Sequence, residues 1–542
     1  MSHRARKHAL ERILRMTPSR SSRAGWISLA LTGFLLSATA CGNSRPGAAL
    51  ADPEPEVATA ESPEGQRTRF LQMFVRGYYP ARTAQLFFVP DEGHFLVARG
   101  DEDYPYMHGS PWSYDTEIPL LLYGPPFIRV GEYGGAATQQ DVAPTLGSLL
   151  GLTGSPGMTG SVLAEAITDT NPPPRAAVLL IMDGLARTAF DRHGEAMPTL
   201  SRLRREGAWF ANAAVTTLPT QTAAGHATVA TGADPRLHGI VGNTFIDRWT
   251  ATPSGPFPGL DPANLMTPSL ADRLNLVTDG RAVIVGQGTA ARAAVPLSGH
   301  GACQFGGRPV ILAVYDESVG RWTTNEECYV LPAYLREMDA RDLLETAGHV
   351  WEGHAIADVS AVRRAGLFSR FEADAVIAMI EGEGVGRDEI PDLVSVNFKT
   401  PDYVAHKYGP DSPEMLEALA ELDRQVGRIV DTLVATAGVG EFVVAVTADH
   451  GMPPEPPVAS ERHYIDELLD LLHDRFDPDG RSLFEVYDPA AAQIVMHPAR
   501  QEALGIDAAI VARFLESQSW IFAAFTETEL RESDAPTKAD TP

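Results

Sequence analysis

Three runs of apolar residues stand out along the chain because each is followed by side chains that bind metal ions. The runs and the residues that follow them are 178–182 with Asp183, 393–398 with Asp402 and His406, and 442–446 with Asp449 and His450. Short unbroken runs rich in Val, Ile and Leu are typical of parallel strands that are buried on both faces. Since the carboxyl ends of parallel strands meet at one edge of a sheet, we expect these ligands to lie together there.

Segments with helical spacing of apolar residues separate these runs. We expect one helix that starts at Met197-Pro198, a second over residues 222–230 and an amphipathic third over residues 414–434. The alternation of strands and helices predicts an α/β fold with a mostly parallel central sheet flanked by helices. Residues 245–390 alternate weakly and contain many glycines and prolines, so we expect them to form a cap insertion over the site.

The N-terminal segment has the pattern of an export signal. Seven basic residues are followed by an apolar stretch from Trp26 to Leu36, and small residues then lead to Cys41. This arrangement resembles a bacterial lipobox, in which the cysteine becomes lipidated, and the alternative is an ordinary cleaved signal. We therefore expect residues 1–41 to be a lipoprotein-type signal. The exported protein would face the periplasm or the cell surface, anchored to the membrane by a lipid on Cys41.

Segments rich in proline divide the rest of the chain. Residues 42–66 have the composition of a flexible linker. A second linker at residues 168–174 contains three consecutive prolines and separates a block at residues 67–167 from the main part of the domain at residues 175–535.

The charge of the chain excludes one class of partner. The formal net charge is −26 and the isoelectric point is near 5.0. A field of this sign repels nucleic acid, so we expect no nucleic acid as a standing partner. A local metal cluster still attracts a small phosphate, so a small phosphoester stays among the substrates that the chain could take.

Two cysteines lie beyond the N-terminal segment. Cys303 and Cys328 both fall in the expected insertion. In an oxidising compartment they form one disulfide, and the alternative is a pair of buried thiols.

A threonine at the start of the second expected helix is a candidate nucleophile. The N-terminus of a helix presents backbone N–H groups and the positive end of the helix dipole, which favour an incoming phosphate. A threonine hydroxyl becomes an effective nucleophile when a metal ion lowers its pKa. Taken alone, Thr222 is better explained as the N-cap of the helix, so its interpretation as a nucleophile depends on the surrounding sequence.

Five segments provide that surrounding sequence. In chain order they are Met-Asp183-Gly, Pro-Thr-Gln-Thr222-Ala-Ala-Gly-His, His238-Gly-Ile-Val-Gly-Asn243, Pro-Asp402-Tyr-Val-Ala-His406-Lys-Tyr-Gly-Pro and Ala-Asp449-His450-Gly-Met. Together they resemble the motifs of the alkaline phosphatase superfamily. The branch that they resemble most is the type I phosphodiesterase/nucleotide pyrophosphatase group with the related single-threonine alkaline phosphatases.

The resemblance implies a dinuclear zinc site and a covalent phosphothreonine intermediate on Thr222. Mixed carboxylate and imidazole ligands suit zinc and also other divalent ions. One ion would be held by the ligands of the first and third runs together with the nucleophile: Asp183, Thr222, Asp449 and His450. The other ion would be held by Asp402 and His406. Asn243 would donate a hydrogen bond to a phosphoryl oxygen, whereas His226 and His238 would be structural.

The second metal site lacks one histidine in this alignment. The family supplies it from a His-Gly segment near the C-terminus, and here none of the downstream histidines is followed by glycine: His463, His473 and His497. A similar segment occurs at residues 106–125, where His108 precedes a glycine, and residues 141–146 resemble the family's closing helix.

We infer a circular permutation from this displaced segment. Residues 67–167 would be the family's C-terminal portion, and His108 would complete the site of Asp402 and His406. The present C-terminus near Phe525 would then adjoin Arg69, as permutation requires surface termini that lie close together.

The segment at residues 288–294 bears on the substrate. Phosphatases of the single-threonine branch use a Lys-x-Arg pair to bind the extra charge of a monoester. Here Arg292 matches the arginine, which can bind phosphate bidentately, but Ala290 replaces the lysine. We expect a secreted phosphomonoesterase, with a phosphodiesterase/nucleotide pyrophosphatase as the alternative. An alternative of another class is a catalytically weak, surface-binding lipoprotein that retains the fold.

Overall fold

The computed structural model describes residues 61–100, 104–154, 157–168, 171–248, 252–455 and 461–534. The expected export signal with Cys41 and most of the expected linker lie outside these residues. Helix α2 (Pro63–Gly77) includes the last four residues of that linker, so ordered structure starts earlier than the composition predicts. Ser62 explains this start, because its side chain accepts a hydrogen bond from Gly65 N at 3.1 Å and a proline follows at the first helical position.

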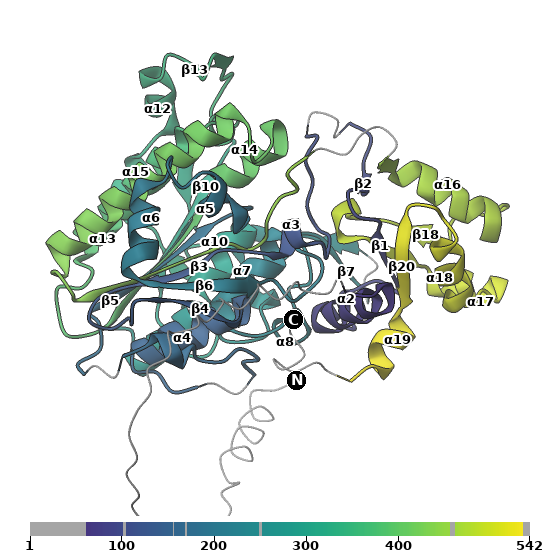
Figure 1. The fold of residues 1–542 in the computed structure, drawn as a ribbon, viewed down its shortest axis with the longest axis horizontal. Coiled ribbons are helices and arrows are strands. Elements are labelled where there is room, and N and C mark those ends of the chain that lie inside the picture. The colour runs from purple at the N-terminus through teal and green to yellow at the C-terminus, as the bar shows by residue number, and fades with distance from the viewer. Residues whose placement is uncertain are drawn as a thin grey trace, which may run out of the picture. The chain divides into compact units, whose positions relative to one another are not determined.

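A large mixed sheet forms the centre of the fold (Figure 1). Among the described residues it has ten strands, in the order β11 (Arg321–Thr323), β10 (Val310–Asp316), β9 (Ile284–Gly288), β15 (Asp392–Phe398), β5 (Ala176–Met182), β16 (Phe442–Thr447), β3 (Leu120–Tyr123), β6 (Ala208–Ala214) and β4 (Gly131–Thr138), with β12 (Tyr329–Val330) beside β10. The strands from β10 to β16 in this order are parallel neighbours. The predicted mostly parallel α/β sheet is thus confirmed.

The register of the three central strands aligns their carboxyl ends. Phe398 of β15 lies opposite Met182 of β5, and Thr447 of β16 lies opposite Ile181. Every residue of these strands is buried, as expected for strands covered on both faces. The residues that follow each strand therefore emerge at the same edge of the sheet.

Helices cover both faces of the central sheet (Figure 1). One face carries α6 (Pro198–Glu206), α13 (Phe368–Glu383) and α15 (Pro413–Thr436), and the other carries α4 (Val142–Leu149), α7 (Thr222–Thr231), α9 (Leu270–Val277) and α10 (Ala291–Ser298). The three helices predicted from apolar spacing are α6, α7 and α15. Helix α15 buries an apolar stripe at helical spacing: Met415, Leu419, Leu422, Val426, Ile429 and Leu433.

The insertion expected over residues 245–390 is smaller than predicted. Strands β9 and β10 and helices α10 and α13 fall within that range but belong to the central sheet and its flanking layers. Strand β9 reads Ile-Val-Gly-Gln-Gly and is fully buried, so it shows neither the alternation nor the apolar run that marks a strand. Cys303 and Cys328 form a disulfide in this region, with their Cα atoms 4.9 Å apart.

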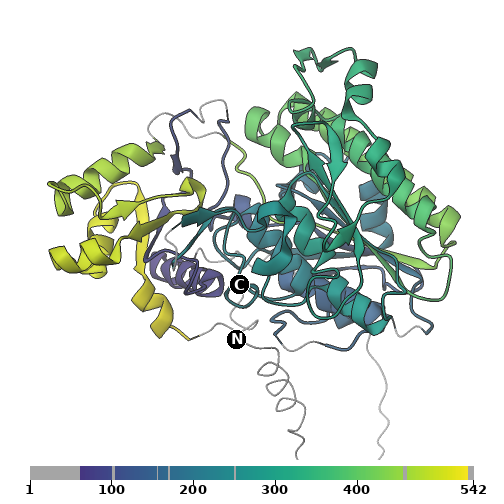
Figure 2. The same ribbon diagram turned by 180° about the vertical axis from the view of Figure 1, so that it is seen from behind.

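A second sheet joins the two ends of the described chain. Its antiparallel order is β18 (Phe484–Glu485), β19 (Gln493–Met496), β1 (Leu86–Pro90) and β20 (Ile521–Thr526). Side chains of β1 alternate between two cores: Leu86 and Phe88 pack with α16 (Ile465–Phe476) and α18 (Ala508–Glu516), and Phe87 and Val89 pack with α2. Figure 2 shows α2 and the α16–α18 layer on opposite faces of this sheet.

The block at residues 67–167 contributes to both sheets. It supplies β1 to the second sheet, and it supplies β3, which lies antiparallel between β16 and β6 in the central one. The residues expected to resemble the family's closing helix form α4. This block is therefore an integral part of both sheets.

Short elements complete the described chain. The helices are α3 (Ser113–Thr116), α5 (Thr188–Arg192), α8 (Pro235–His238), α11 (Ala333–Glu337), α12 (Ala340–Thr346), α14 (Thr400–Tyr408), α17 (Pro498–Leu504) and α19 (Glu527–Glu532). The strand pairs are β2 (Phe95–Val97) with β17 (Arg462–Tyr464), β7 (Phe245–Asp247) with β8 (Thr252–Ser254), and β13 (Val350–Trp351) with β14 (His354–Ala355). Across the described ranges, no helix has the length and apolar composition to cross a membrane.

Candidate active site

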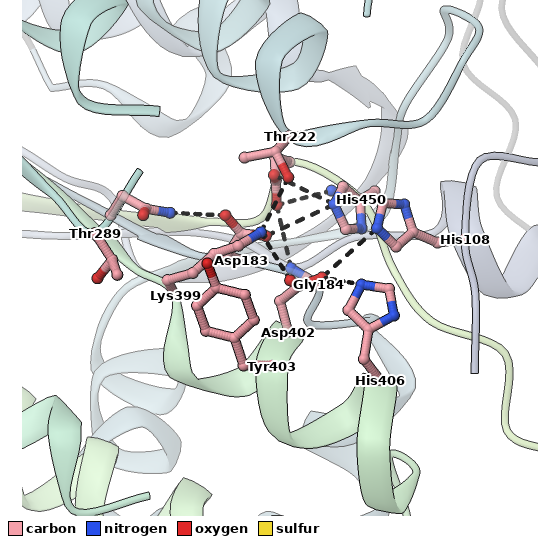
Figure 3. Close-up of polar contacts among 12 residues, drawn as sticks. His108, Asp183, Gly184, Thr222, Thr289, Lys399, Asp402, Tyr403, His406 and His450 are labelled. Atoms are coloured by element: carbon pink, nitrogen blue, oxygen red, sulfur yellow. Dashed lines mark hydrogen bonds and ion pairs between the residues drawn. The ribbon is translucent and has the colours of Figure 1, made fainter. Parts of the chain in front are cut away.

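The ends of β5 and β16 bring three predicted ligands together. Asp183 follows β5, and Asp449 and His450 follow β16 (Figure 3). His450 Nε2 lies 3.6 Å from Asp183 Oδ1 and 3.4 Å from Asp449 Oδ2, and all three side chains are fully buried. Three acceptor atoms at this spacing surround a position that suits a divalent cation.

A second cluster contains Asp402, His406 and His108. Asp402 and His406 are one turn apart on α14, and His406 Nε2 lies 3.3 Å from Asp402 Oδ1. His108 comes from the loop before α3, and its Nε2 lies 3.6 Å from the same oxygen (Figure 3). The histidine expected from the displaced segment thus lies beside the two residues that it was expected to join.

The three histidines have the same orientation. Each Nδ1 lies within hydrogen-bond distance of a backbone carbonyl oxygen: 2.8 Å for His108 to Thr220, 2.6 Å for His406 to Tyr106 and 3.0 Å for His450 to Gly451. A carbonyl oxygen only accepts, so the proton sits on Nδ1 and the Nε2 lone pair faces the carboxylates. This carbonyl support of the distal nitrogen is the usual arrangement of histidines that bind metals.

Several facing atoms of the two clusters lack hydrogen bonds. Among the described residues, Asp402 Oδ1, Asp449 Oδ2 and His450 Nε2 are buried acceptors without a hydrogen-bond partner. Buried acceptors left unpaired are costly, and a cation at each cluster would satisfy them. Burial, reinforced by the neighbouring His450 and His406, lowers the pKa of His108 well below its usual value, as a neutral ligand requires. The residues present therefore fit two divalent ions.

Thr222 stands at the start of α7, and its Oγ1 lies 3.0 Å from Lys399 Nζ (Figure 3). It is the first residue of the helix, with Gln221 before it in an extended conformation, so the helix starts at the threonine itself. Asn243 Oδ1 accepts a hydrogen bond from Ala223 N at 3.1 Å, and its own N–H donates to Gln221 Oε1 at 2.9 Å. These contacts hold the predicted phosphate-binding asparagine beside the helix N-terminus.

Lys399 occupies the centre of the site and was not predicted from the sequence. Its Nζ lies 2.7 Å from Asp183 Oδ1, 2.7 Å from Asp402 Oδ2 and 3.0 Å from Thr222 Oγ1. Burial opposes its charge, but the carboxylates of Asp183 and Asp402 outweigh burial and raise the pKa of Lys399. The only signal in the sequence is its place directly after a buried strand, three residues before Asp402.

His226 and His238 have structural hydrogen bonds, in agreement with the prediction. His226 Nδ1 lies 2.9 Å from Thr222 O, and Asn397 Nδ2 donates to His226 Nε2 at 2.9 Å. His238 Nδ1 accepts from Ile240 N at 3.1 Å, and burial lowers the pKa of His238 to about 3. His226 thus links α7 to β15, and His238, whose Nε2 lies 3.1 Å from Thr228 Oγ1, links α7 to the turn at Ile240.

A buried aspartate fixes the loop that carries His108. Asp115 Oδ2 accepts hydrogen bonds from Gly109 N at 3.0 Å, Ser110 N at 2.8 Å and Ser110 Oγ at 2.7 Å. Gly109 has φ +133°, and a Cβ atom there would lie 2.1 Å from Ala490 O, so only glycine fits after the histidine. The His-Gly pair is thus a geometric requirement of this loop.

Arg292 and Asp488 border the site on the side of α10. Ala290 is the N-cap of α10 and Arg292 is its second residue, and Arg292 Nε is buried with no hydrogen-bond partner in the described part of the chain. Gln221 Nε2 donates to Asp488 Oδ2 at 3.1 Å. Burial raises the pKa of Asp488, and the charge of Arg292 is among the groups that oppose this rise. The hydrogen bond with Gln221 places the carboxylate of Asp488 beside the residue that precedes α7.

Comparison with known proteins agrees with the fold and the motifs. The family model for type I phosphodiesterase/nucleotide pyrophosphatase matches residues 177–511. Alkaline phosphatase PafA of Elizabethkingia meningoseptica is 26% identical over 353 residues, which are 56% of this chain and 64% of that protein. Alkaline phosphatase PhoD of Zymomonas mobilis is 25% identical over 434 residues, 70% of this chain and 73% of that protein.

One human relative and one crystal structure extend the comparison. Human ectonucleotide pyrophosphatase/phosphodiesterase family member 7 is 34% identical over 83 residues, 15% of this chain and 17% of that protein. The crystal structure of PafA superposes with a TM-score of 0.51 at 19% identity and covers 67% of this chain and 78% of that chain. The α/β fold with metal-ligand clusters at its strand ends is that of the alkaline phosphatase superfamily. Within that class, the chain belongs to the type I phosphodiesterase/nucleotide pyrophosphatase family.

Proposed function

We propose that the chain is a metal-dependent phosphomonoesterase that acts through a phosphothreonine on Thr222. The observation that carries this proposal is the pair of buried ligand clusters that flank Thr222, with facing acceptor atoms that have no hydrogen bonds among the described residues. Asp183, Thr222, Asp449 and His450 would hold one divalent ion. Asp402, His406 and His108 would hold the other, and zinc suits both sets of ligands.

In the proposed reaction, Thr222 Oγ1 attacks the phosphorus of a small phosphoester. The bond from Oγ1 to phosphorus forms, the bond from phosphorus to the ester oxygen breaks, and the leaving alcohol takes up a proton. Water then attacks the same phosphorus, which restores the threonine hydroxyl and releases inorganic phosphate. Bound divalent ions would supply Lewis-acid stabilisation of charge on the attacking and leaving oxygens. Asn243 and Arg292 would donate hydrogen bonds to the phosphoryl oxygens.

Variants of Thr222 test this proposal. Thr222→Ala lowers kcat for para-nitrophenyl phosphate by roughly 10³-fold or more, and Thr222→Ser retains turnover because it retains a hydroxyl. Metal content, measured by mass spectrometry, stays close to that of the wild type in both, because Asp183, Asp449 and His450 remain to hold the ion that Thr222 would also contact. Transfer of a chiral phosphoryl group to an acceptor alcohol proceeds with retention, since two displacements each invert the phosphorus. Inversion, or an alanine variant with wild-type turnover, would remove Thr222 as the nucleophile.

A phosphodiesterase activity is the second candidate. The observation that favours it is Ala290, which stands at the N-cap of α10 where the related phosphatases have a lysine. A diester carries one charge less than a monoester, so a site with a single cation from α10 would suit it. A binding protein without turnover is the candidate of another class, and it would bind phosphate without hydrolysing either ester.

We also propose that the chain is a circular permutation of its family. Support comes from the neighbourhood of the two ends: Phe525 of β20 packs against Phe74 of α2 with ring centroids 5.8 Å apart, and the Arg67 guanidinium lies 4.6 Å from the Phe525 ring. A chain that starts at residue 175 and carries residues 63–167 after residue 534 is expected to fold with the same metal content. Its failure to bind the second ion would contradict the permutation.

We further propose export and lipid attachment at Cys41 on the sequence pattern alone. Cys41→Ser is expected to abolish incorporation of labelled fatty acid and to release the protein from the membrane fraction. An unaltered membrane fraction would favour an ordinary cleaved signal and another means of retention.

A further inference from the structure

We propose that Lys399 is a catalytic residue that supplies, from the end of β15, the positive charge that position 290 lacks on α10. The inference rests on the proposed function of Thr222, and it narrows the substrate class to phosphomonoesters. The lysine is 1% exposed, and its ammonium touches the oxygen that would attack phosphorus, 3.0 Å from Nζ.

The hydrogen bonds of Lys399 use its full donor capacity. An ammonium has three N–H groups, and Nζ has three oxygen partners: Asp183 Oδ1, Asp402 Oδ2 and Thr222 Oγ1. Asp183 belongs to one metal-ligand cluster and Asp402 to the other. The lysine therefore lies between the positions expected for the two ions. Its direction is fixed by three groups from three separate segments of the chain.

The lysine leaves room for both ions. It contacts Asp402 through Oδ2, whereas His108 and His406 face the other oxygen, Oδ1. Of the ligands proposed for the first ion, it shares Asp183 Oδ1 and Thr222 Oγ1 but contacts neither Asp449 Oδ2 nor His450 Nε2, which are both without hydrogen bonds among the described residues. Lys399 is therefore a third cation of the site rather than a replacement for either ion.

The position of Lys399 matches the need of a monoester. A cation 3.0 Å from Thr222 Oγ1 acts through its charge on a phosphoryl group bonded to that same atom, without a further hydrogen bond. The charge of Arg292, in the first turn of α10, is among the groups that lower the pKa of Lys399, after burial and beside the two carboxylates that raise it. Fixed cations directed at a phosphoryl group stabilise the charge that a monoester carries and a diester lacks.

One buried carboxyl holds this arrangement together. Glu372 Oε1 accepts hydrogen bonds from Lys399 N at 3.2 Å and from Thr289 Oγ1 at 2.6 Å. Thr289 directly precedes Ala290, the N-cap of α10. The lysine backbone and the start of the helix that carries Arg292 are thus joined through α13.

The test compares two esters in a matched pair of variants. Lys399→Met removes the ammonium and keeps most of the stem volume, and Lys407→Met makes the same change at an exposed position of α14. With the metal-loaded enzyme, Lys399→Met is expected to lower kcat/KM for para-nitrophenyl phosphate by roughly 100-fold, and that for bis-para-nitrophenyl phosphate far less. Binding of inorganic phosphate, measured by calorimetry, is expected to weaken, with the metal content retained. Lys407→Met is expected to match the wild type in each measurement.

Two results would overturn the proposal. One is that Lys399→Met lowers kcat/KM by the same factor for the monoester and the diester. The other is that Lys399→Met changes neither the ratio of the two kcat/KM values nor the affinity for inorganic phosphate. Lys399→Gln serves as the second variant if circular dichroism shows that the methionine variant does not fold, and the same outcomes decide it. A wild-type protein that hydrolyses neither ester would instead contradict the proposed function. Failure of the proposed function can thus be distinguished from failure of the Lys399 proposal. Ala290→Lys added to Lys399→Met is expected to restore part of the monoester preference.

Discussion

His108 Nε2 lies 3.6 Å from Asp402 Oδ1, although the two residues are far apart in the sequence. His108 is held by Asp115 and by the carbonyl of Thr220, and Asp402 is held by the first turn of α14 and by Lys399. The contact joins the block at residues 67–167 to the main part of the catalytic fold. It is the contact expected if His108 completes the site of Asp402 and His406.

The first prediction concerns the metal content of a His108 variant. His108→Ala is expected to lose the ion at Asp402 and His406 and to keep the ion at Asp183, because only the former site loses a ligand. Removal of a ligand is expected to lower the affinity of that site for zinc by at least roughly tenfold, which is the loss seen when a residue that only supports a ligand is removed. Titration with zinc, followed by mass spectrometry, measures both sites.

A matched control for this variant is His497→Ala, which removes a partly exposed imidazole paired with Glu485 far from the motifs. It is expected to bind both ions as the wild type does. Undiminished zinc in His108→Ala would show that His108 is no ligand.

The second prediction concerns pH and Glu372. Burial raises the pKa of Glu372 from 4.5 to about 8, against the opposing hydrogen bonds of Thr289, Lys399 and Thr400. The folded state thus keeps a proton that the unfolded state has lost. The stabilisation is complete below pH 4.5 and is lost as the pH rises towards 8, at about 1.4 kcal/mol per pH unit.

Urea unfolding in the presence of a chelator measures this effect without metal binding. The wild type is expected to lose free energy of unfolding across that pH range relative to Glu372→Gln, whose amide does not titrate. Parallel pH profiles for the two proteins would show that Glu372 is ionised in the folded state.

The third prediction concerns the disulfide. Cys303 and Cys328 are 25 residues apart, and a loop of that length predicts about 3 kcal/mol of stabilisation through the restricted unfolded chain. The double variant Cys303→Ser/Cys328→Ser is expected to lose this amount in urea unfolding. The reduced wild type is expected to lose a similar amount, and equal stability of oxidised and reduced protein would contradict the estimate.

The sequence predicts the strand ends well because the runs at residues 178–182 and 442–446 are unbroken and the run at residues 393–398 is interrupted only by Ser395 and Asn397. The runs that precede Asp183, Asp402 and Asp449 became β5, β15 and β16, and parallel register brought their ligands to one edge. The alternation of helices and strands was sufficient for the fold class. The family motifs located Thr222 at a helix start.

Other features depend on contacts that no local pattern contains. The sequence of strand β9 gives no strand signal because its two glycines interrupt the apolar run, and its burial comes from its neighbours β10 and β15. The sequence does not predict the position of Lys399 because a lysine after a strand is usually exposed. It is buried here because carboxylates from two separate segments surround it. Asp115 lies in the segment at residues 106–125 that resembles a family motif, but no local pattern shows that its carboxylate holds the loop of His108.

The measurement that tests the central claim most directly is the hydrolysis of para-nitrophenyl phosphate and of bis-para-nitrophenyl phosphate by the zinc-reconstituted wild type. The proposed monoesterase, with Lys399 and Arg292 facing the phosphoryl group, predicts a clearly higher kcat/KM for the monoester. A higher kcat/KM for the diester would contradict this account and would favour the phosphodiesterase candidate.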